Sequence, residues 1–484
     1  MSQPRELPRR IVVAGDGPLG VLTAIALRRA LPRTEVVVLA IPPDPAAFAE
    51  RFGTALPFTN RLHDRLGIEE ENLVRQAGAS HRLIMRYFGG AGHDWQGAAG
   101  YGAAIDPAMK TAFAREWGGG PRNAGTGAPP RSLGEVLAAV GRFAPPSGET
   151  DSPLGEVDYA LRWNVPAYRA HLIGIAQALG VHHERGTAKA VVPDGAGGLA
   201  ALAIEGVGEL SADLFVDCSG SGAALLSAMP EMQWIDWRAG LPTRGLAIAA
   251  PGPPMVALED RASFTPLGWR WELAGRDGRQ ALLGVPAGAS DEAIAAALGS
   301  EPDAIVAFAP GRAAAPWLGN VIALGSAAAE LEPLGGIAQD LAHRQLALLL
   351  ELLPGRSVDP AERAEFNRRS GLMADRAADW LAAHYAAPAP TAQFPDLTLS
   401  PELFRTLDQF TRRGRLPFFE DAPMLVQEFG ALLQAVGVPS GQGPLAAADS
   451  TSEESAARAF EARANAAFHA APLYGEWLTR SLAG

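Results

Sequence analysis

The sequence predicts an α/β protein built on a doubly wound, Rossmann-like nucleotide-binding fold. Three segments carry this prediction, at residues 11–30, 212–220 and 320–353, because each joins a short apolar strand pattern to a glycine-rich turn. The long intervals between them indicate insertions into one fold rather than a string of domains. The composition agrees with a sizeable core, since 48% of the 484 residues are hydrophobic and only 19% are charged.

The first of the three segments carries the clearest pattern. Residues 11–14 are apolar enough for a buried strand, residues 15–20 form a glycine-rich turn, and an Ala/Leu-rich helix runs to about Pro32. A second apolar run at residues 35–39 completes a βαβ unit of about 30 residues. Glycine at such a turn lets the backbone approach a pyrophosphate at a helix N-terminus, where unpaired N–H groups favour anions. The context predicts a dinucleotide site, with a turn that has lost its nucleotide as the alternative.

One component of a dinucleotide site is missing from this unit. An acidic residue is expected at the end of the second strand, where it would hold the ribose hydroxyls, but Ala40 stands there. Asp44 is the next acid, and Pro42 and Pro43 separate it from the strand.

The remaining chain alternates between patterns. Helices are expected from residue 50 to about residue 117, then a loose Gly/Pro/Ala-rich stretch at residues 118–130. A helix is expected at residues 167–179 and short alternating segments at residues 187–204. From residue 359 onward the pattern is helical.

Charge and cysteine content exclude several functional classes. The chain has 41 basic and 53 acidic residues, a net charge of −12 that repels phosphate backbones, so nucleic-acid binding is not expected. No apolar run approaches the roughly 18 residues of a membrane span, and no secretion signal is recognisable, so we expect a cytoplasmic protein. The single cysteine, Cys218, excludes an internal disulfide framework, and no metal site is predicted.

Several motifs, taken in order, resemble those of the flavin-dependent tryptophan halogenase family. The glycine turn at 15–20 lies where that family has its FAD loop, and DLFVDCSG at 213–220 is close to the family's DLFIDCSG. NVIALG at 320–325, followed by EPL at 332–334, is similar to its NVVAIG and EPLEST, and GWRWEL at 268–273 is similar to its GWxWxIP. Two later segments also match, His384-Tyr385 and GPLA at 443–446.

The resemblance implies an FAD-binding fold of the flavin monooxygenase and halogenase type with a mostly helical substrate module. It implies FAD reduced by a separate flavin reductase, a halide, and an aromatic small-molecule substrate; a homodimer is left open. The FAD module would comprise residues 1–90, 165–225 and 310–355. The substrate module would comprise the inserted residues 91–164 and 226–309 and the C-terminal residues 356–484. The residues implied to bind FAD are Gly15, Gly17, Pro18, Leu19, Gly20, Ala40, Ala188, Gly325, Ser326, Gly336, Ile337 and Ala338.

The chain departs from the family at its catalytic lysine. In relatives, hypohalous acid travels to a lysine beside the aromatic substrate; here Arg82 takes that place. A guanidinium stays protonated and has no nitrogen lone pair with which to form a haloamine. Arg82 could donate hydrogen bonds to an oxidant or an anion, or it could be a salt-bridged or surface arginine.

A second departure removes the family's catalytic glutamate. Gly335 occupies its position, and Gly336 and Ile337 replace the serine and threonine that follow it. Glycine cannot act as a general base, and the loss of the hydroxyls weakens the halide site expected beside the flavin.

Three further residues are candidates for contact with a substrate or an oxidant. Trp269 and Trp271 face the same side of a predicted strand, and we expect either a core pair or a gate for substrate and oxidant. His81 precedes Arg82 and could help to position the oxidant.

Three functional hypotheses follow. The first is an FAD-dependent monooxygenase or oxidase acting on an indole-like molecule. The second is a halogenase with an unusual catalytic constellation. The third is a catalytically silent paralogue that binds flavin or another ligand.

Overall fold

The computed structural model describes residues 6–89, 96–101, 132–146, 152–417, 419–441 and 450–483. The loose stretch at 118–130 and the GPLA segment at 443–446 therefore lie outside the described residues. The chain divides into two compact units. Unit 1 comprises Met1–Gly78, Trp163–Arg238 and Val306–Ala378; unit 2 comprises Ala79–Arg162, Ala239–Ile305 and Asp379–Gly484.

Unit 1 is built on a six-stranded sheet in the order β19-β20-β11-β1-β2-β7. All neighbouring strands are parallel except β19 and β20. The strands are β1 (Arg10–Ala14), β2 (Glu35–Leu39), β7 (His182–Glu184), β11 (Leu214–Asp217), β19 (Trp317–Leu318) and β20 (Val321–Ala323). The three strand–glycine segments of the sequence supply β1, β11 and β20, which are adjacent in the sheet, so the predicted Rossmann-like fold is confirmed.

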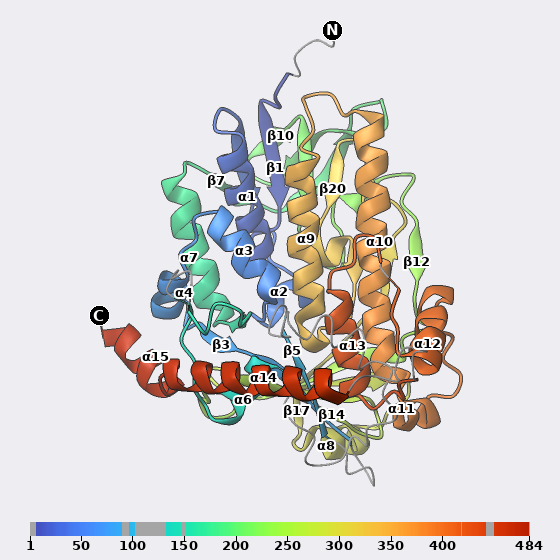
Figure 1. The fold of residues 1–484 in the computed structure, drawn as a ribbon. Coiled ribbons are helices and arrows are strands. Elements are labelled where there is room, and N and C mark those ends of the chain that lie inside the picture. Colours follow the sequence, from blue (N-terminus) through green and yellow to red (C-terminus); the bar gives the residue numbers. More distant parts are fainter. Residues whose placement is uncertain are drawn as a thin grey trace. The chain divides into compact units, whose positions relative to one another are not determined.

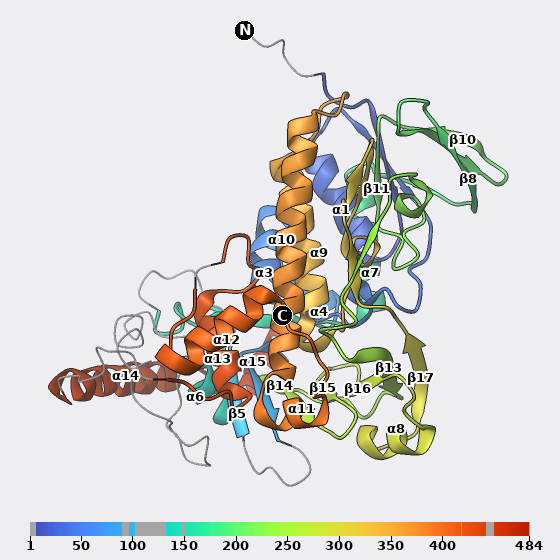
Figure 2. The same ribbon diagram turned by 90° about the vertical axis from the view of Figure 1, so that its right-hand side faces the viewer.

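Helices and a small sheet cover opposite faces of this sheet. α1 packs against α7 and α9 on one face (Figure 1). On the other face, alternate residues such as Val12 and Ala14 of β1 join the core beneath the β10-β9-β8 sheet; Figure 2 shows this sheet and α9 on opposite sides of β11. The helices and turns are α1 (Pro18–Ala30), α2 (Phe48–Arg51), α3 (Pro57–Arg65), α4 (Glu70–Gln76), α7 (Val165–Ala178), α9 (Ile337–Glu351), η2 (Leu226–Ala228), η3 (Gly325–Ala327) and η4 (Leu334–Gly336). The other strands are β8 (Ala188–Pro193), β9 (Leu199–Ile204), β10 (Gly208–Ser211), β12 (Trp234–Asp236), β18 (Gly311–Ala313) and β21 (Ala329–Glu330).

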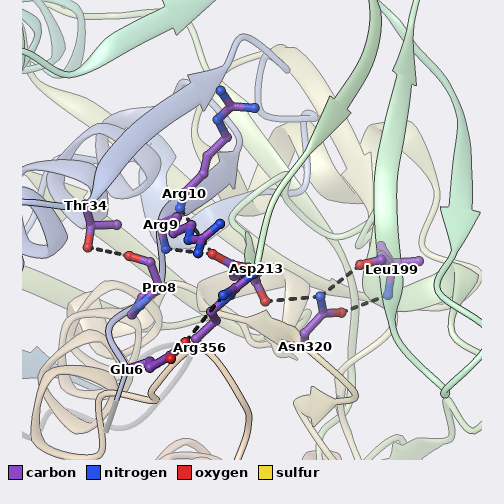
Figure 3. A network of polar contacts seen from close by, with 9 residues as sticks. All are labelled: Glu6, Pro8, Arg9, Arg10, Thr34, Leu199, Asp213, Asn320 and Arg356. Atoms are coloured by element: carbon purple, nitrogen blue, oxygen red, sulfur yellow. Dashed lines mark hydrogen bonds and ion pairs between the residues drawn. The ribbon is translucent and has the colours of Figure 1, made fainter.

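A polar network ties together the amino ends of the central strands (Figure 3). The Asp213 carboxylate, just before β11, accepts from the Arg9 N–H at 2.6 Å and pairs with Arg356 at 3.3 Å. The Asn320 amide, just before β20, exchanges two hydrogen bonds with the backbone of Leu199. These contacts hold the sheet at the end opposite to the glycine turn, which follows β1.

Unit 2 contains a seven-stranded sheet in the order β17-β13-β16-β15-β14-β4-β5 and a two-stranded sheet of β3 and β6. Its strands are β3 (Ser80–Arg82), β4 (Ile84–Phe88), β5 (Gln96–Gly100), β6 (Ala160–Arg162), β13 (Thr243–Ala249), β14 (Glu259–Phe264), β15 (Trp269–Leu273), β16 (Gln280–Pro286) and β17 (Pro302–Ala307). The expectation that helices dominate from residue 50 to about residue 117 is therefore wrong for residues 80–88 and 96–100, and residues 102–117 lie outside the described residues. Strands β3 to β5 form there because β4 pairs in parallel with β14, about 175 residues later, and local patterning cannot reveal such a partner.

The helical expectation for the C-terminal part is confirmed. α10 (Pro360–Tyr385) begins in unit 1 and ends in unit 2, and the helices of unit 2 are α6 (Leu133–Ala139), α8 (Asp291–Leu298), α11 (Pro388–Gln393), α12 (Pro401–Arg413), α13 (Val426–Ala435), α14 (Ser450–Ala470) and α15 (Tyr474–Ala483). Among the described residues, no helix combines the length and apolar character needed to cross a membrane.

Candidate functional site

The glycine turn between β1 and α1 has the backbone geometry of a dinucleotide turn. Gly15 has a φ of +129°, and a Cβ there would overlap the carbonyl oxygen of Cys218. A Cβ on Gly20 would overlap the carbonyl oxygen of Gly15. The first glycine thus permits the tight turn, and the third permits the close packing of the helix on the turn.

The space over Gly17 together with the first backbone donor of α1, here called the cradle, fits an anionic oxygen, and a carboxyl oxygen of Glu50 occupies it. α1 begins at Pro18, which has no N–H, so Leu19 offers the next backbone donor. That N–H donates to Oε2 of Glu50 at 2.8 Å, and a Cβ on Gly17 would overlap the same carboxylate. The turn therefore has the open approach and the donor that a diphosphate oxygen requires, and a carboxyl oxygen of the chain stands in that position.

Glu50 is a buried acid that the sequence analysis missed. It lies on α2 with 5% of its surface exposed. Burial raises the pKa of Glu50 to about 8, and the nearby acids Asp16 and Asp44 also raise it. The hydrogen bond from Leu19 and the charge of Arg169 act in the opposite direction and lower this pKa. The sequence feature that could have indicated Glu50 is a single acid within the mostly apolar run AAFAERF at residues 46–52.

The loop after β20 lies against this turn. Gly325 has a φ of +61°, and a Cβ there would overlap the side chain of Leu19. Its N–H donates to the Gln345 side chain at 2.9 Å. The hydroxyl of Ser326 is buried and accepts a long hydrogen bond, 3.4 Å, from the N–H of Ala49. The predicted cofactor residues Leu19, Gly325 and Ser326 are thus brought together.

Two successive left-handed glycines lead into α9. Gly335 has φ 68° and ψ 2°, and Gly336 has φ 80° and ψ 11°. A Cβ on Gly336 would lie 2.9 Å from the carbonyl oxygen of Thr54. Ile337 and Ala338 form the first turn of α9. The backbone conformation before α9 therefore favours glycine, and residues 335 and 336 supply no carboxylate.

The predicted ribose end of the site has no acid at the expected position. Ala40 follows β2, and its N–H donates to the carbonyl oxygen of Glu184 at 2.9 Å. Asp44 is engaged elsewhere, since its carboxylate accepts from the Ser221 hydroxyl at 2.8 Å in the loop after β11. Ala188 begins β8 and packs against the core shared with the main sheet.

In unit 2, Arg82 lies on β3 with no exposed surface and forms an ion pair with Asp260 of β14, which is also fully buried. Its guanidinium also donates to the Tyr101 hydroxyl at 3.4 Å and the Leu161 carbonyl oxygen at 3.5 Å. Burial lowers the pKa of Arg82 from its ordinary value, and Tyr101 opposes this. The structure therefore has a salt-bridged arginine at the position that resembles the family lysine.

His81, beside Arg82, lies in an aromatic cluster of unit 2. Its Nδ1 and its backbone N–H both lie within hydrogen-bonding distance of the Tyr474 hydroxyl, at 2.9 and 2.7 Å. The rings of Phe143, Tyr159 and Trp477 surround it at centroid distances of 5.1 to 5.4 Å.

Trp269 and Trp271 are buried on β15, with 1% and 2% of their surfaces exposed. The Trp269 indole N–H donates to the His384 carbonyl oxygen at 3.3 Å. The imidazole of His384 lies 3.2 Å from the Tyr87 hydroxyl through Nε2 and 2.9 Å from the Trp380 carbonyl oxygen through Nδ1. Burial lowers the pKa of His384 to about 4, although its backbone hydrogen bonds oppose the shift.

Other polar candidates have structural environments. Cys218 is buried, and desolvation raises the pKa of its thiol well above the ordinary value, which suits a small apolar residue and not a nucleophile. Asp217 accepts from the N–H groups of Ser219, Leu225 and Leu226, and so shapes the turn after β11. Among the described residues, no group of three or more His, Cys, Asp or Glu side chains is placed to hold a metal ion.

Comparisons with known proteins agree with these features. The sequence model of the tryptophan halogenase family matches residues 10–451. Tryptophan 7-halogenase RebH of Lentzea aerocolonigenes is 24% identical over 468 residues, covering 87% of this chain and 85% of its own. The solved structure of BrvH, a flavin-dependent halogenase from Brevundimonas sp. BAL3, shares the fold, with a TM-score of 0.83, 24% identity and coverage of 98% and 99%. Xcc4156, a flavin-dependent halogenase from Xanthomonas campestris, gives a TM-score of 0.84 at 22% identity, with the same coverage. With nearly the whole sequence matched, the chain belongs to the tryptophan halogenase family.

Proposed function

We propose that the chain is an FAD-dependent oxidoreductase that oxygenates or oxidises an indole-like aromatic molecule without the family's lysine–glutamate halogenation chemistry. The observation that carries this proposal is the buried ion pair of Arg82 with Asp260. A permanently charged guanidinium neutralised by a carboxylate cannot present the amine that captures an oxidised halogen.

FAD is the cofactor of this family, and a separate flavin reductase supplies it in reduced form. In this chain the backbone of residues 15–20 would hold the diphosphate, because its glycines leave room there for an oxyanion. Ser326 and the backbone of residues 335–338 would lie beside the flavin ring. Reduced FAD supplies the electrons that activate dioxygen, and this chemistry does not itself need a halide.

The loop before α9 supports the loss of halogenation. Gly335 and Gly336 lack the carboxylate and hydroxyl that relatives have in the EPLEST motif, and both adopt left-handed conformations. The side chain of Ile337 is fully buried and apolar. These residues leave backbone N–H groups as polar contacts but offer no general base near the ring.

We also propose that one module binds FAD and the other binds the aromatic substrate. Residues 1–90, 165–225 and 310–355 would form the FAD module, and the remaining segments would bind the aromatic substrate. Trp269, Trp271 and His81 are the proposed substrate or gating residues of the second module, and Arg82 would position the oxidant rather than carry it.

A catalytically silent paralogue is the second candidate function. The observation that favours it is the Glu50 carboxyl group in the cradle at Gly17, which leaves the first free N–H of α1 already engaged. Such a protein would bind flavin or another ligand without converting a substrate.

FAD titration tests the proposed cofactor site, and turnover of an indole by the FAD-loaded protein separates the oxidoreductase from a silent paralogue that binds flavin. The oxidoreductase should give a saturable change in flavin fluorescence, and Gly17→Glu should weaken FAD binding at least tenfold by placing a second carboxylate in the cradle. Gly174→Glu is the matched control, because a Cβ at this α7 position has nothing within 4 Å. Equal affinities for the wild type and Gly17→Glu would contradict the proposed site, and an absence of saturable binding would favour the silent paralogue.

A further inference from the structure

Resting on the proposed FAD site, we propose that Glu50 is an intramolecular occupant of the diphosphate cradle, so that FAD binds only by displacing it. The cradle is complete without the cofactor because α2 delivers a carboxyl oxygen to the Leu19 N–H. A phosphate oxygen and the Glu50 oxygen need the same donor and the same space over Gly17. The two occupants therefore exclude each other.

The segment that carries Glu50 is packed within unit 1, since Ala47, Phe48 and Ala49 have only 2–3% of their surfaces exposed, so movement of this segment must break specific contacts. Asp44 accepts from Ser221 and Gly222 at 2.8 and 3.3 Å, and the Phe48 ring packs edge-on against Phe308 at 5.1 Å. The hydrogen bond from Ala49 to Ser326 is long, at 3.4 Å. α2 has only four residues, so its own hydrogen bonds add little resistance to movement.

A protonated Glu50 occupies the cradle without adding a charge to the acids around it. Glu50 faces Asp16 on the turn after β1, Asp44 on its own segment, Arg169 on α7 and Cys218 after β11. Arg169 is the one cation in this set, and it already pairs with Asp16. A diphosphate added beside Asp16 and Asp44 would meet repulsion from these acids, whereas the neutral Glu50 carboxyl group excludes it by occupying the donor and the space over Gly17.

Displacement couples FAD binding to release of a proton. In the cradle, burial raises the pKa of Glu50 to about 8, so its carboxyl group is protonated at neutral pH. Once in water the group returns to its ordinary pKa of about 4.3 and ionises, and the proton passes to the buffer. FAD binding to the wild type should therefore tighten as pH rises from about 5 to 8, by up to tenfold per pH unit.

The test compares FAD dissociation constants of the wild type, Glu50→Ala and Glu50→Gln from fluorescence titrations at pH 5.5 to 8. At pH 6.5, Glu50→Ala should bind FAD at least tenfold more tightly, because the cradle is empty. In both variants the dependence on pH should largely disappear. Glu71→Ala is the control, since it removes one acid from an exposed ion pair of α4 with Arg75. If Glu50→Ala does not fold, the pH profile of Glu50→Gln still tests the coupling.

The outcomes separate this inference from the proposed function. Tighter FAD binding by Glu50→Ala together with a flattened pH profile supports displacement. Equal or weaker binding with an unchanged pH profile overturns it while leaving the FAD-dependent function intact. Absence of FAD binding by the wild type and by both variants overturns the inference and the proposed function together.

Discussion

Arg82 of β3 and Asp260 of β14 form an ion pair in which neither side chain reaches solvent. The two residues lie 178 positions apart, and the pair links the two-stranded sheet to the seven-stranded sheet of unit 2. Removing one partner of such a pair leaves an uncompensated buried charge, which costs far more than the pair itself contributes.

Arg82→Met is expected to destabilise unit 2 by about 3–5 kcal/mol, because Asp260 would remain buried without a counter-charge. Denaturant unfolding followed by tryptophan fluorescence measures this free energy. Arg75→Ala, which removes an exposed pair with Glu71, should cost less than about 1 kcal/mol. Adding Asp260→Leu to Arg82→Met should recover most of the loss, and failure to recover it would contradict the pairing.

The double change Arg82→Lys with Gly335→Glu should not restore halogenation. An ammonium at position 82 would be held protonated by buried Asp260, and a non-glycine residue at 335 must adopt a left-handed conformation. Misplacement of reacting groups by about 1 Å costs on the order of 100-fold in rate, so two restored side chains do not rebuild a site. Product masses from a panel of indoles and phenols, with reductase and halide, provide the readout. Robust halogenated product would show that the pocket is otherwise intact.

Stability should fall in acid because His384 is buried without charge. The pKa of His384 is lowered to about 4 in the folded protein, against 6.5 in the unfolded chain, so the unfolded state takes up the proton first. The contribution of neutral His384 to the free energy of unfolding is therefore complete above pH 6.5 and is lost as pH falls through about 4. His384→Gln should reduce the pH slope of the unfolding free energy in this window by up to about 1.4 kcal/mol per pH unit. His182→Gln, at an exposed position on β7, is the control substitution.

The Rossmann-like half could be predicted because its information is local. β1, the glycine turn, α1 and β2 follow one another within 30 residues, and the predicted ranges for both strands agree with the structure within one residue. The later strands β11 and β20 were also recognisable, since each is apolar and ends in a glycine-containing loop.

The remaining site features depend on partners that are distant in sequence. Glu50 was missed because its acceptor role depends on Leu19, 31 residues earlier, and on a turn geometry that only the fold creates. The environment of Arg82 depends on Asp260, which carries no motif of its own. Sequence alone showed that the family lysine was absent, and it could not distinguish a buried ion pair from a surface arginine.

Product analysis under ¹⁸O₂ distinguishes oxygenation or oxidation of an indole from halogenation. The wild-type protein is supplied with FAD, a flavin reductase and its electron donor, chloride or bromide, and tryptophan together with other indoles, and the products are analysed by mass spectrometry. We expect oxidised or ¹⁸O-labelled products that depend on FAD, with no halogenated tryptophan, because position 82 presents a paired guanidinium and position 335 presents no carboxylate. Steady chlorination or bromination of tryptophan would contradict this expectation.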